Sequence, residues 1–461
     1  MLAIPVLIPL MIWGISKPEV FFLFSIAIMN SKLILPGFPG ELQLFHITFL
    51  FVGVVMFIRM IITKERFVMD GSLRFATLLY GFIAFYTMLA RGIGFQVLGT
   101  GQAGGMRYVV IYLGVIILWF VSNVRVSQRQ IRNALIFSAL FSFLPVLAEA
   151  VLLLSGGKIY QHYYFLQAGF GLGDALMDYE TGQGVRFMSA AILGRGLVYL
   201  PFFFLIFSRK NAVGYILLIG MGLFIGAFSG FRSVFIATNL FLLLIGFLMF
   251  RNHWKAFVIS TAGVGIAGYC FVFLIFDFLP YGIQRTVSFL PFIAHGSEAL
   301  RDGLSTMDFR YGVWTLAVKE IPQYLWLGRG LAFDQNEYIA LQTIYGLSDM
   351  IFLRGLIANL HNGALEVLIG FGCPGAVAFV LFLFRASRVS LVSVKKQTGK
   401  PEIYRLCCIF TSLILTTVFL FMFSFGTPYD TFLSLCINLT IIHILITSGE
   451  KMTQKNLSEV K

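Results

Sequence analysis

The sequence predicts an all-α polytopic membrane protein with 12 or 13 transmembrane helices and a large extracytoplasmic loop before the last three spans. Hydrophobic residues occupy 58% of the 461 positions and charged residues only 12%, whereas soluble domains are about half apolar and about a quarter charged. Apolar runs recur along nearly the whole chain, and several approach the roughly 20 helical residues that cross a bilayer. These observations point away from a water-soluble fold.

Thirteen apolar runs are the predicted spans. The first has no basic region before it and no small-residue cleavage site after it, so we expect a retained span rather than a signal peptide. If the first two runs form one broken helix, the count is 12. In chain order the runs cover residues 2–15, 20–35, 45–63, 75–90, 108–121, 134–154, 187–208, 212–228, 233–250, 256–279, 362–384, 403–425 and 431–447.

Basic residues in the short loops predict which side each loop faces. From the third run onward they occupy alternate loops, at Lys64 and Arg66, Arg125 to Arg132, Arg209 and Lys210, Arg251 and Lys255, and Arg385 to Lys400. Because short basic loops stay in the cytoplasm, we expect these loops and the tail to be cytoplasmic. The same bias accounts for much of the net charge of +13, so this charge does not imply a nucleic-acid partner.

The longest hydrophilic loops are then predicted on the opposite, outer side of the membrane. One connection there has roughly 80 residues, which is far beyond ordinary loop length and indicates a functional loop or a small subdomain. The predicted organisation is N-terminal helices over 1–186, central helices over 187–279, a large periplasmic loop over 280–360, C-terminal helices over 361–447 and a cytoplasmic tail over 448–461.

The sequence carries no cofactor or metal motif. Its five cysteines lie in apolar segments without CxxC spacing, so they predict neither a disulfide framework nor a zinc site. P-loop, HExxH, GxSxG and DxD-like patterns are also missing. We therefore expect chemistry without a metal and without an organic cofactor.

A histidine and an asparagine end the long outer loop. His361 and Asn362 directly precede an apolar run that contains Glu366. Asn362 is a residue type that caps helices, and the start of a helix on the outer side favours anionic oxygen. His361 would then be a titratable base beside that anion. The alternative is that the pair only caps a helix among lipid headgroups.

Arg232 lies in a tight turn between two apolar runs. The turn reads Ser-Gly-Phe-Arg-Ser over residues 229–233, and no acidic residue is near it in sequence. An ionisable group at the bilayer border needs a partner, and guanidinium binds phosphate oxygens bidentately. The alternative is that Arg232 extends to lipid headgroups.

Arg310 opens a predicted amphipathic helix in the long loop, and a turn containing Arg329 follows at 326–330. Arg310 could reach the same anion as Arg232, or it could be an ordinary solvated charge. One face of this helix is predicted to be apolar, with Trp314, Ala317, Val318 and Ile321.

Together these stretches resemble the O-antigen ligase family, which includes many O-antigen and exopolysaccharide polymerases. Its pattern of His, then Asn, Ser or Gln, then nine residues and Gly-x-x-Gly is met by His361, Asn362, Gly372 and Gly375. The family also has an arginine in a Ser-Gly-x-Arg-Ser-like turn, and Arg232 matches that position. A further family arginine opens an Arg-x-x-x-Trp helix that precedes a Gly-x-Gly turn, and Arg310 matches that position. The resemblance covers roughly 187–384, and the family has 12 spans.

The resemblance implies a donor, an undecaprenyl-diphosphate-linked glycan, presented at the outer leaflet of the bacterial inner membrane, and a metal-independent transfer. Arg232 and Arg310 would clamp the diphosphate, and His361 would activate the acceptor hydroxyl as general base. Asn362, Glu366 and Arg329 would orient or bind substrate. The acceptor would be lipid A–core or a growing polysaccharide, and Arg285, Arg301 and Arg329 could serve an anionic acceptor.

Other functions remain open from the sequence. The histidine motif suits both a ligase and a polymerase, and its full fit to the family pattern slightly favours the ligase. A flippase for the same lipid would explain Pro145 and Glu149 inside one span, yet we find no internal repeat of the kind that transporters carry. A non-catalytic assembly protein would leave His361 replaceable.

Overall fold

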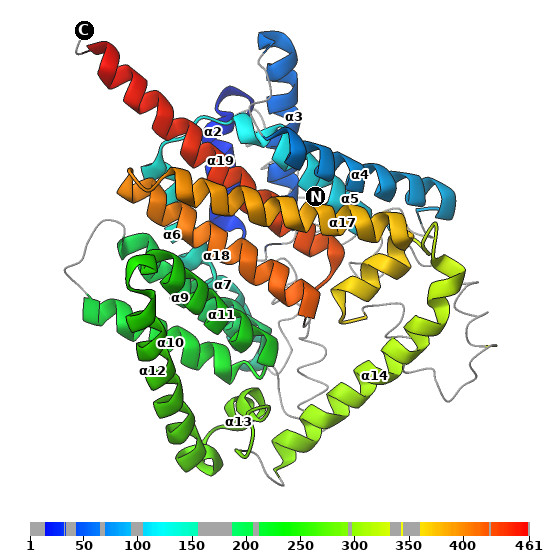
Figure 1. Cartoon of the computed structure of the whole chain (residues 1–461), viewed down its shortest axis with the longest axis vertical. Helices are drawn as coiled ribbons and strands as arrows, with labels where there is room; N and C mark the ends of the chain where they lie inside the picture. The colour runs from blue at the N-terminus through cyan, green and yellow to red at the C-terminus, as the bar shows by residue number, and fades with distance from the viewer. Residues whose placement is uncertain are drawn as a thin grey trace.

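The computed structural model of the chain describes residues 14–31, 33, 43–64, 70–93, 105–154, 187–205, 212–293, 297–331, 343, 360–423 and 426–459. Almost all of the predicted first span and the predicted outer loop 155–186 lie outside these residues. The described residues form α-helices joined by turns and short 3₁₀ segments (Figure 1). The predicted fold class, an all-α polytopic membrane protein, is confirmed.

The helices follow the predicted apolar runs. Nine helical segments of the described chain are long and apolar enough to cross a membrane, and three shorter apolar helices accompany them. The bounds are α2 (Pro18–Ile28), α3 (Leu44–Thr63), α4 (Gly71–Arg91), α5 (Met106–Trp119), α6 (Gln128–Phe141), α7 (Phe143–Leu154), α9 (Met188–Leu205), α10 (Ala212–Phe228), α11 (Arg232–Met249), α12 (Trp254–Ile275), α13 (Tyr281–Val287), α14 (Glu298–Tyr324), α17 (Gly363–Lys396), α18 (Pro401–Phe423) and α19 (Pro428–Glu459).

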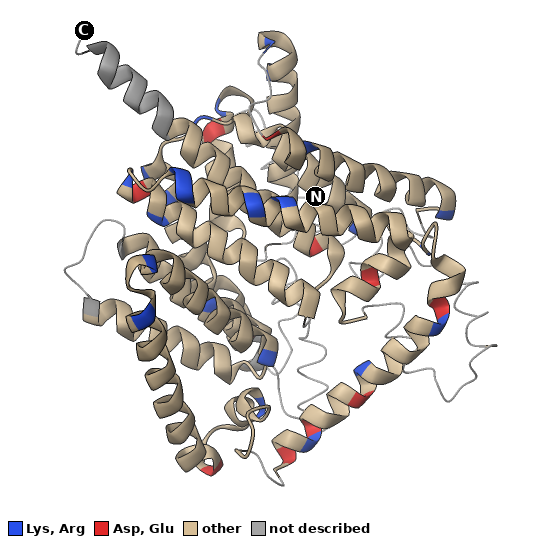
Figure 2. Cartoon of the chain, in the orientation of Figure 1, with Lys and Arg blue, Asp and Glu red and all other residues tan. Residues whose placement is uncertain are grey.

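Contacts between distant helix ends support the predicted alternation of sides. The hydroxyl of Tyr404, at the start of α18, donates to the carbonyl of Leu248, at the end of α11, over 2.8 Å. At the opposite face, the end of α4 meets the turn after α14, where Arg91 Nε donates to the Gly328 carbonyl over 2.9 Å. Lys and Arg gather along the C-terminal half of α17 and around the turn from α11 to α12 (Figure 2).

Two predicted spans have different limits in the structure. The run 134–154 begins earlier and is interrupted at Ser142, between α6 and α7. Pro145 explains this break, because it has no N–H for the carbonyl of Phe141 and its ring crowds that carbonyl. The run 362–384 continues as α17 to Lys396, past the apolar stretch.

A kink divides α17 in its N-terminal part. Gly372 has φ of 69°, a backbone conformation that glycine adopts at no steric cost, and Pro374 follows it. Pro374 cannot donate to the carbonyl of Gly370. The N–H of Gly330 donates to this carbonyl instead, over 2.9 Å. Membrane helices tolerate such breaks when neighbouring groups replace the lost bonds.

The turn after α14 supplies further bonds to the same kink. The N–H of Arg329 donates to the carbonyl of Ile369, and the N–H of Cys373 donates to the carbonyl of Leu325, each over 2.7 Å. A Cβ at Gly328 would overlap the Gly370 carbonyl, so the close approach requires glycine there. The first part of α17 is therefore fixed by hydrogen bonds to the turn after α14.

Candidate active site

The turn before Arg232 is shaped by its serine and glycine. Gly230 has φ of 76°, which glycine adopts readily. The Ser229 hydroxyl donates to the Gly226 carbonyl over 2.6 Å and accepts from the N–H of Phe231 over 3.3 Å. These bonds end α10 and start α11 within three residues, so Arg232 is the first residue of α11.

The side chain of Arg232 is held against α13. Its Nε donates to the carbonyl of Arg285 over 3.0 Å, and its Nη2 donates to the hydroxyl of Ser288 over 2.7 Å. Ser288 is fixed in turn, because its hydroxyl donates to the Arg285 carbonyl over 2.9 Å. The guanidinium of Arg232 thus has a defined plane and folds back onto the protein.

α14 passes directly over this guanidinium. A Cβ placed on Gly303 would overlap the Nη2 of Arg232, so only a hydrogen at that position leaves room for the arginine. α14 runs along one edge of the bundle, from the region of α13 to the first half of α17 (Figure 1). Gly303 is therefore the point at which α14 closes over Arg232.

Arg232 and Arg310 line the same cavity, as their predicted pairing requires. The cavity has a volume of about 580 Å³ and lies among the start of α11, the end of α13 and the first half of α14. Arg285 and Ser288 contribute to its polar side. Its other wall is apolar, with Ile236, Phe289, Leu290, Phe292, Leu304 and Met307. The cavity therefore combines three guanidinium-bearing residues with an apolar surface.

From the sequence, Arg285 was expected only among the basic residues that could serve an anionic acceptor, and not as a neighbour of Arg232 and Arg310. It is buried in α13 and forms an ion pair with Asp302 of α14. The only sequence signal was its place among the basic residues of the outer loop. Its burial depends on how α13 packs on α14, which no local pattern reveals.

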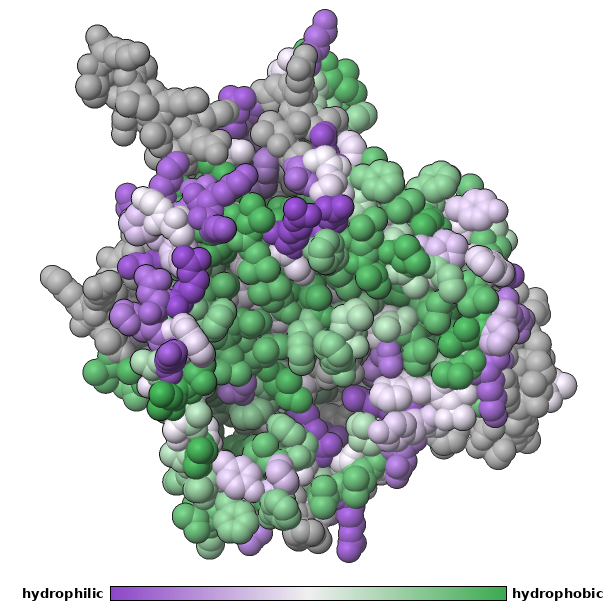
Figure 3. All heavy atoms as spheres, in the orientation of Figure 1, coloured by the Kyte–Doolittle hydropathy of each residue, from purple (hydrophilic) through white to green (hydrophobic). Residues whose placement is uncertain are grey.

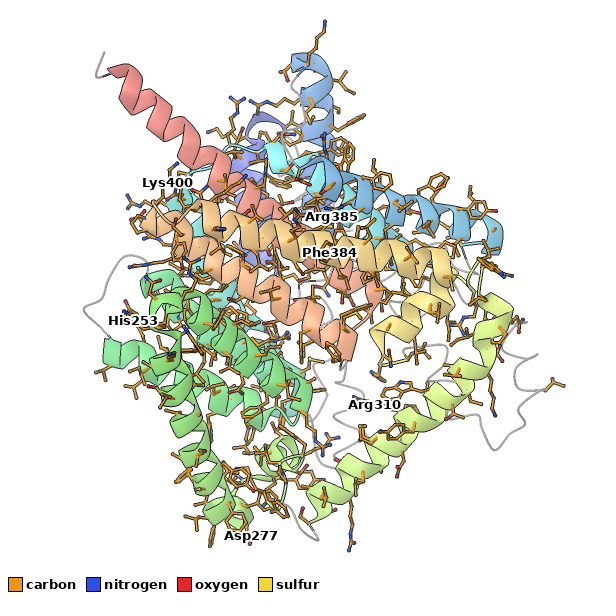
Figure 4. The ribbon with its side chains drawn as sticks, in the orientation of Figure 1. His253, Asp277, Arg310, Phe384, Arg385 and Lys400 are labelled. Carbon is orange, nitrogen blue, oxygen red and sulfur yellow. The ribbon has the colours of Figure 1, made fainter. Side chains whose placement is uncertain are left out.

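Arg310 lies in the middle of α14, not at a helix start as predicted (Figure 4). The helix begins twelve residues earlier, at Glu298, where the hydroxyl of Ser297 accepts from the N–H of Leu300 over 3.2 Å. The predicted apolar face is also partly wrong. Ala317 is buried, but Val318 is 53% exposed, because the packed face is rotated toward Val313 and Leu316.

One face of α14 connects Arg232 with the start of α17. Residues three and four apart are neighbours on a helix surface, and Gly303, Met307, Arg310 and Trp314 follow this spacing. The indole Nε1 of Trp314 donates to the carbonyl of Leu360 over 2.7 Å. Trp314 lies about 6 Å beyond Arg310 along the helix axis, so this bond joins the residue before His361 to a side chain that starts about one turn from Arg310.

His361 has an unusual backbone conformation. Its φ is 51°, in the left-handed region, where residues other than glycine are uncommon and histidine and asparagine are enriched. Asn362 caps the helix as predicted, since its side chain accepts from the N–H of Leu365 over 3.1 Å. His361 is not among the described residues that line the 580 Å³ cavity. It follows Leu360, whose carbonyl is bonded to Trp314 on the face of α14 that also carries Arg310.

Glu366 and Arg329 belong to a different environment from the two cavity arginines. Glu366 is buried in the first half of α17, where Arg107, Arg329 and Asp430 act on it electrostatically. Arg107 is also buried, with its guanidinium 5.4 Å from the centre of the Tyr429 ring. Neither Glu366 nor Arg329 is among the described residues that line the cavity. Both residues therefore lie in or beside the first half of α17, away from the cavity that Arg232 and Arg310 line.

Within the described residues, no group of three or more His, Cys, Asp or Glu side chains is arranged to hold a metal ion. A search of protein-family models found no match, and a search of curated proteins found no relative.

Proposed function

We propose that this chain is a membrane glycosyltransferase of the O-antigen ligase type. It would transfer an undecaprenyl-diphosphate-linked glycan to lipid A–core at the periplasmic face of the bacterial inner membrane, without a metal ion. The observation that carries the proposal is the meeting of Arg232 and Arg310, 78 residues apart in sequence, on one cavity of about 580 Å³. The loop charges support a periplasmic position for this cavity.

The two walls of the cavity suit the two parts of such a donor. A diphosphate carries several anionic oxygens, which guanidinium groups bind through charge-assisted hydrogen bonds. The aromatic and aliphatic residues of the other wall, including Phe289, Phe292 and Leu304, are exposed apolar groups that suit the first isoprene units. A cavity for a small soluble anion would not need this apolar wall.

The proposed reaction is a displacement at the anomeric carbon. The acceptor hydroxyl oxygen bonds to that carbon, the bond from the carbon to the diphosphate oxygen breaks, and the hydroxyl proton passes to His361. Arg232 and Arg310 stabilise the negative charge that develops on the leaving diphosphate. Fixed cations in a partly dehydrated site are effective in this role because they need no reorganisation during the reaction.

A gel of surface glycans from a strain that lacks this gene tests the ligase assignment. Loss of a ligase leaves lipid A–core without any repeat units. Loss of a polymerase leaves core that carries a single unit, and this pattern would replace the ligase proposal by the polymerase alternative. Unchanged glycan in the deletion strain would contradict both.

Metal removal should not affect the transfer. If guanidinium groups stabilise the leaving diphosphate, purified protein in detergent should transfer glycan at the same rate in excess EDTA as in buffer. The measurement is the initial rate of conversion of lipid-linked donor. Loss of activity in EDTA with recovery on adding Mg²⁺ would contradict the metal-independent mechanism.

Replacing Gly303 by alanine should separate activity from stability. The added methyl group must displace the Arg232 guanidinium, so we expect transfer to fall at least about tenfold, since small misplacements of catalytic groups carry large rate penalties. Alanine favours helices over glycine by up to about 1 kcal/mol, but displacing Arg232 breaks its two hydrogen bonds to α13, worth about 1 kcal/mol each. We therefore expect the unfolding temperature to fall only slightly, far less than the transfer rate.

Gly265 in α12 provides the matched control for this substitution. It is also a helical glycine, and a Cβ at this position would meet no neighbouring group within 4 Å, so Gly265→Ala should retain full activity. Thermal unfolding and transfer rate are measured for both variants. Full activity in Gly303→Ala would mean that the observed position of Arg232 is not needed for transfer.

A further inference from the structure

A second cavity lies on the face that the loop charges predict to be cytoplasmic. It has a volume of about 550 Å³ and is bounded by the start of α4, the C-terminal half of α17 and the last part of α19. It is formed by helices on the opposite side of the bundle from the 580 Å³ cavity, and the proposed transfer does not use it. In the described part of the chain, four basic side chains and one carboxylate line it: Arg385, Arg388, Lys396, Lys400 and Asp70.

The single carboxylate of this cavity is engaged in local structure. Asp70 caps α4, and its Oδ1 accepts from the N–H groups of Ser72 and Leu73, each over 3.0 Å, and from the Ser72 hydroxyl over 2.5 Å. These bonds, the Ser72 hydroxyl bond above all, lower the pKa of Asp70. Among the described lining residues, and with Lys400 left out of the count, Arg385, Arg388 and Lys396 still outnumber the one carboxylate, that of Asp70. This excess of positive charge favours the binding of an anion.

The surroundings of the cavity are those of a lipid site. Its remaining lining includes aliphatic side chains from α17 and α19: Val389, Val392, Leu439, Ile442 and Ile446. Phe384, directly before Arg385, is 59% exposed. Hydrophilic side chains form an island over α17 where Arg385 is labelled in Figure 4, and apolar surface extends beside it (Figure 3).

Cations that border an apolar membrane surface are unfavourable without a counter-ion. A free inorganic ion would supply charge but would leave the aliphatic side chains exposed. A phospholipid supplies both parts, because its phosphate can meet the arginines while its glycerol and first acyl carbons cover the aliphatic residues. Basic cavities between membrane helices on the cytoplasmic side bind anionic lipid headgroups in this way.

We infer that the cavity between α4, α17 and α19 binds the headgroup of an anionic phospholipid of the inner leaflet, with Arg385 and Arg388 holding its phosphate. Lys396 and Lys400 lie further toward the end of α17 and would meet a second anionic group or the aqueous edge of the headgroup. The other end of α17 follows directly after His361 and the capping residue Asn362. Lipid binding here would stabilise the C-terminal half of α17 against α4 and α19.

The test is a lipid titration of the full chain in detergent, read by native mass spectrometry. We expect phosphatidylglycerol to bind in preference to phosphatidylcholine. In the triple variant Arg385→Gln, Arg388→Gln, Lys396→Gln, its binding should weaken about a hundredfold, as expected from the loss of three cations near a membrane surface.

The matched control removes the same charge elsewhere on the same predicted face, as Arg129→Gln, Arg251→Gln, Lys255→Gln, whose three residues are exposed and do not line the cavity. It should bind phosphatidylglycerol like the unmodified chain. Equal weakening in the control would overturn the site, because it would indicate a general charge effect.

Two measurements on the unmodified chain keep the inference testable if the triple variant does not fold. Equal binding of phosphatidylcholine and phosphatidylglycerol would overturn it. A second titration with inorganic phosphate and glycerol 3-phosphate distinguishes a lipid from a free anion. We expect neither to compete with phosphatidylglycerol at equal concentration, and full competition by either would assign the cavity to a free phosphate.

Discussion

Arg232→Gln and Arg310→Gln should each lower glycan transfer by about 100- to 1,000-fold, the usual effect of removing one fixed donor from developing negative charge. Glutamine is neutral and cannot bind two phosphate oxygens as guanidinium does. The effect should fall on the rate at saturating donor, because the charge on the diphosphate grows as the bond to the sugar breaks. The measurement is the single-turnover rate of purified protein with lipid-linked donor.

Arg301→Gln is the matched control for these variants. Arg301 lies on the same helix as Arg310, but it is exposed and is not among the described residues that line the cavity. Its loss should therefore leave the transfer rate at saturating acceptor unchanged, even if Arg301 contributes to acceptor binding. Arg232 also bonds to Arg285 and Ser288, and thermal unfolding must therefore accompany the Arg232 variant. If Arg310→Gln and Arg301→Gln have the same activity, the diphosphate does not bind at this cavity.

His361→Asn should lower transfer by about 100- to 10,000-fold, the range over which a positioned general base acts. Asparagine is the informative replacement because it tolerates the left-handed backbone that His361 adopts. The variant thus keeps the turn before α17 but has no group that can take the acceptor proton. Binding of the lipid-linked donor should change little, since the imidazole acts on the acceptor.

Asn362→Ala distinguishes catalysis from helix capping at the same place. Its loss removes the bond to the N–H of Leu365 and should cost about 1 kcal/mol of stability, with a smaller effect on transfer than His361→Asn. The two variants are compared by unfolding temperature and by transfer rate. If His361→Asn loses stability but keeps its rate per folded molecule, the histidine only shapes the turn.

Local features of the sequence predicted the spans well. Apolar runs gave the helices, and basic loops gave an alternation that contacts between distant ends, such as Tyr404 with Leu248, support. Asn362 was identified as a cap from its type and place. Such features are local, because a helix cap or an apolar run depends on residues within a few positions.

Errors arose where packing overrides local pattern. The helix of Arg310 starts at Glu298 and turns a different face inward, since its packing against the first half of α17 decides which residues are buried. At the kink near Gly372, the carbonyls of residues 369 and 370 accept hydrogen bonds from the N–H groups of residues 329 and 330, some 40 positions away. No pattern within either segment could predict that pairing.

The sequence by itself determined that the protein has many membrane-spanning helices, and it identified the residues worth testing. This was possible because apolar composition and loop charge follow directly from insertion into a membrane. Only the tertiary structure decided that Arg232 and Arg310 share a cavity, that Arg285 joins them and that Gly303 makes room for the guanidinium. These facts depend on where α14 crosses α11 and α13. That crossing is set by the shapes of side chains far apart in the chain, which become neighbours only after folding.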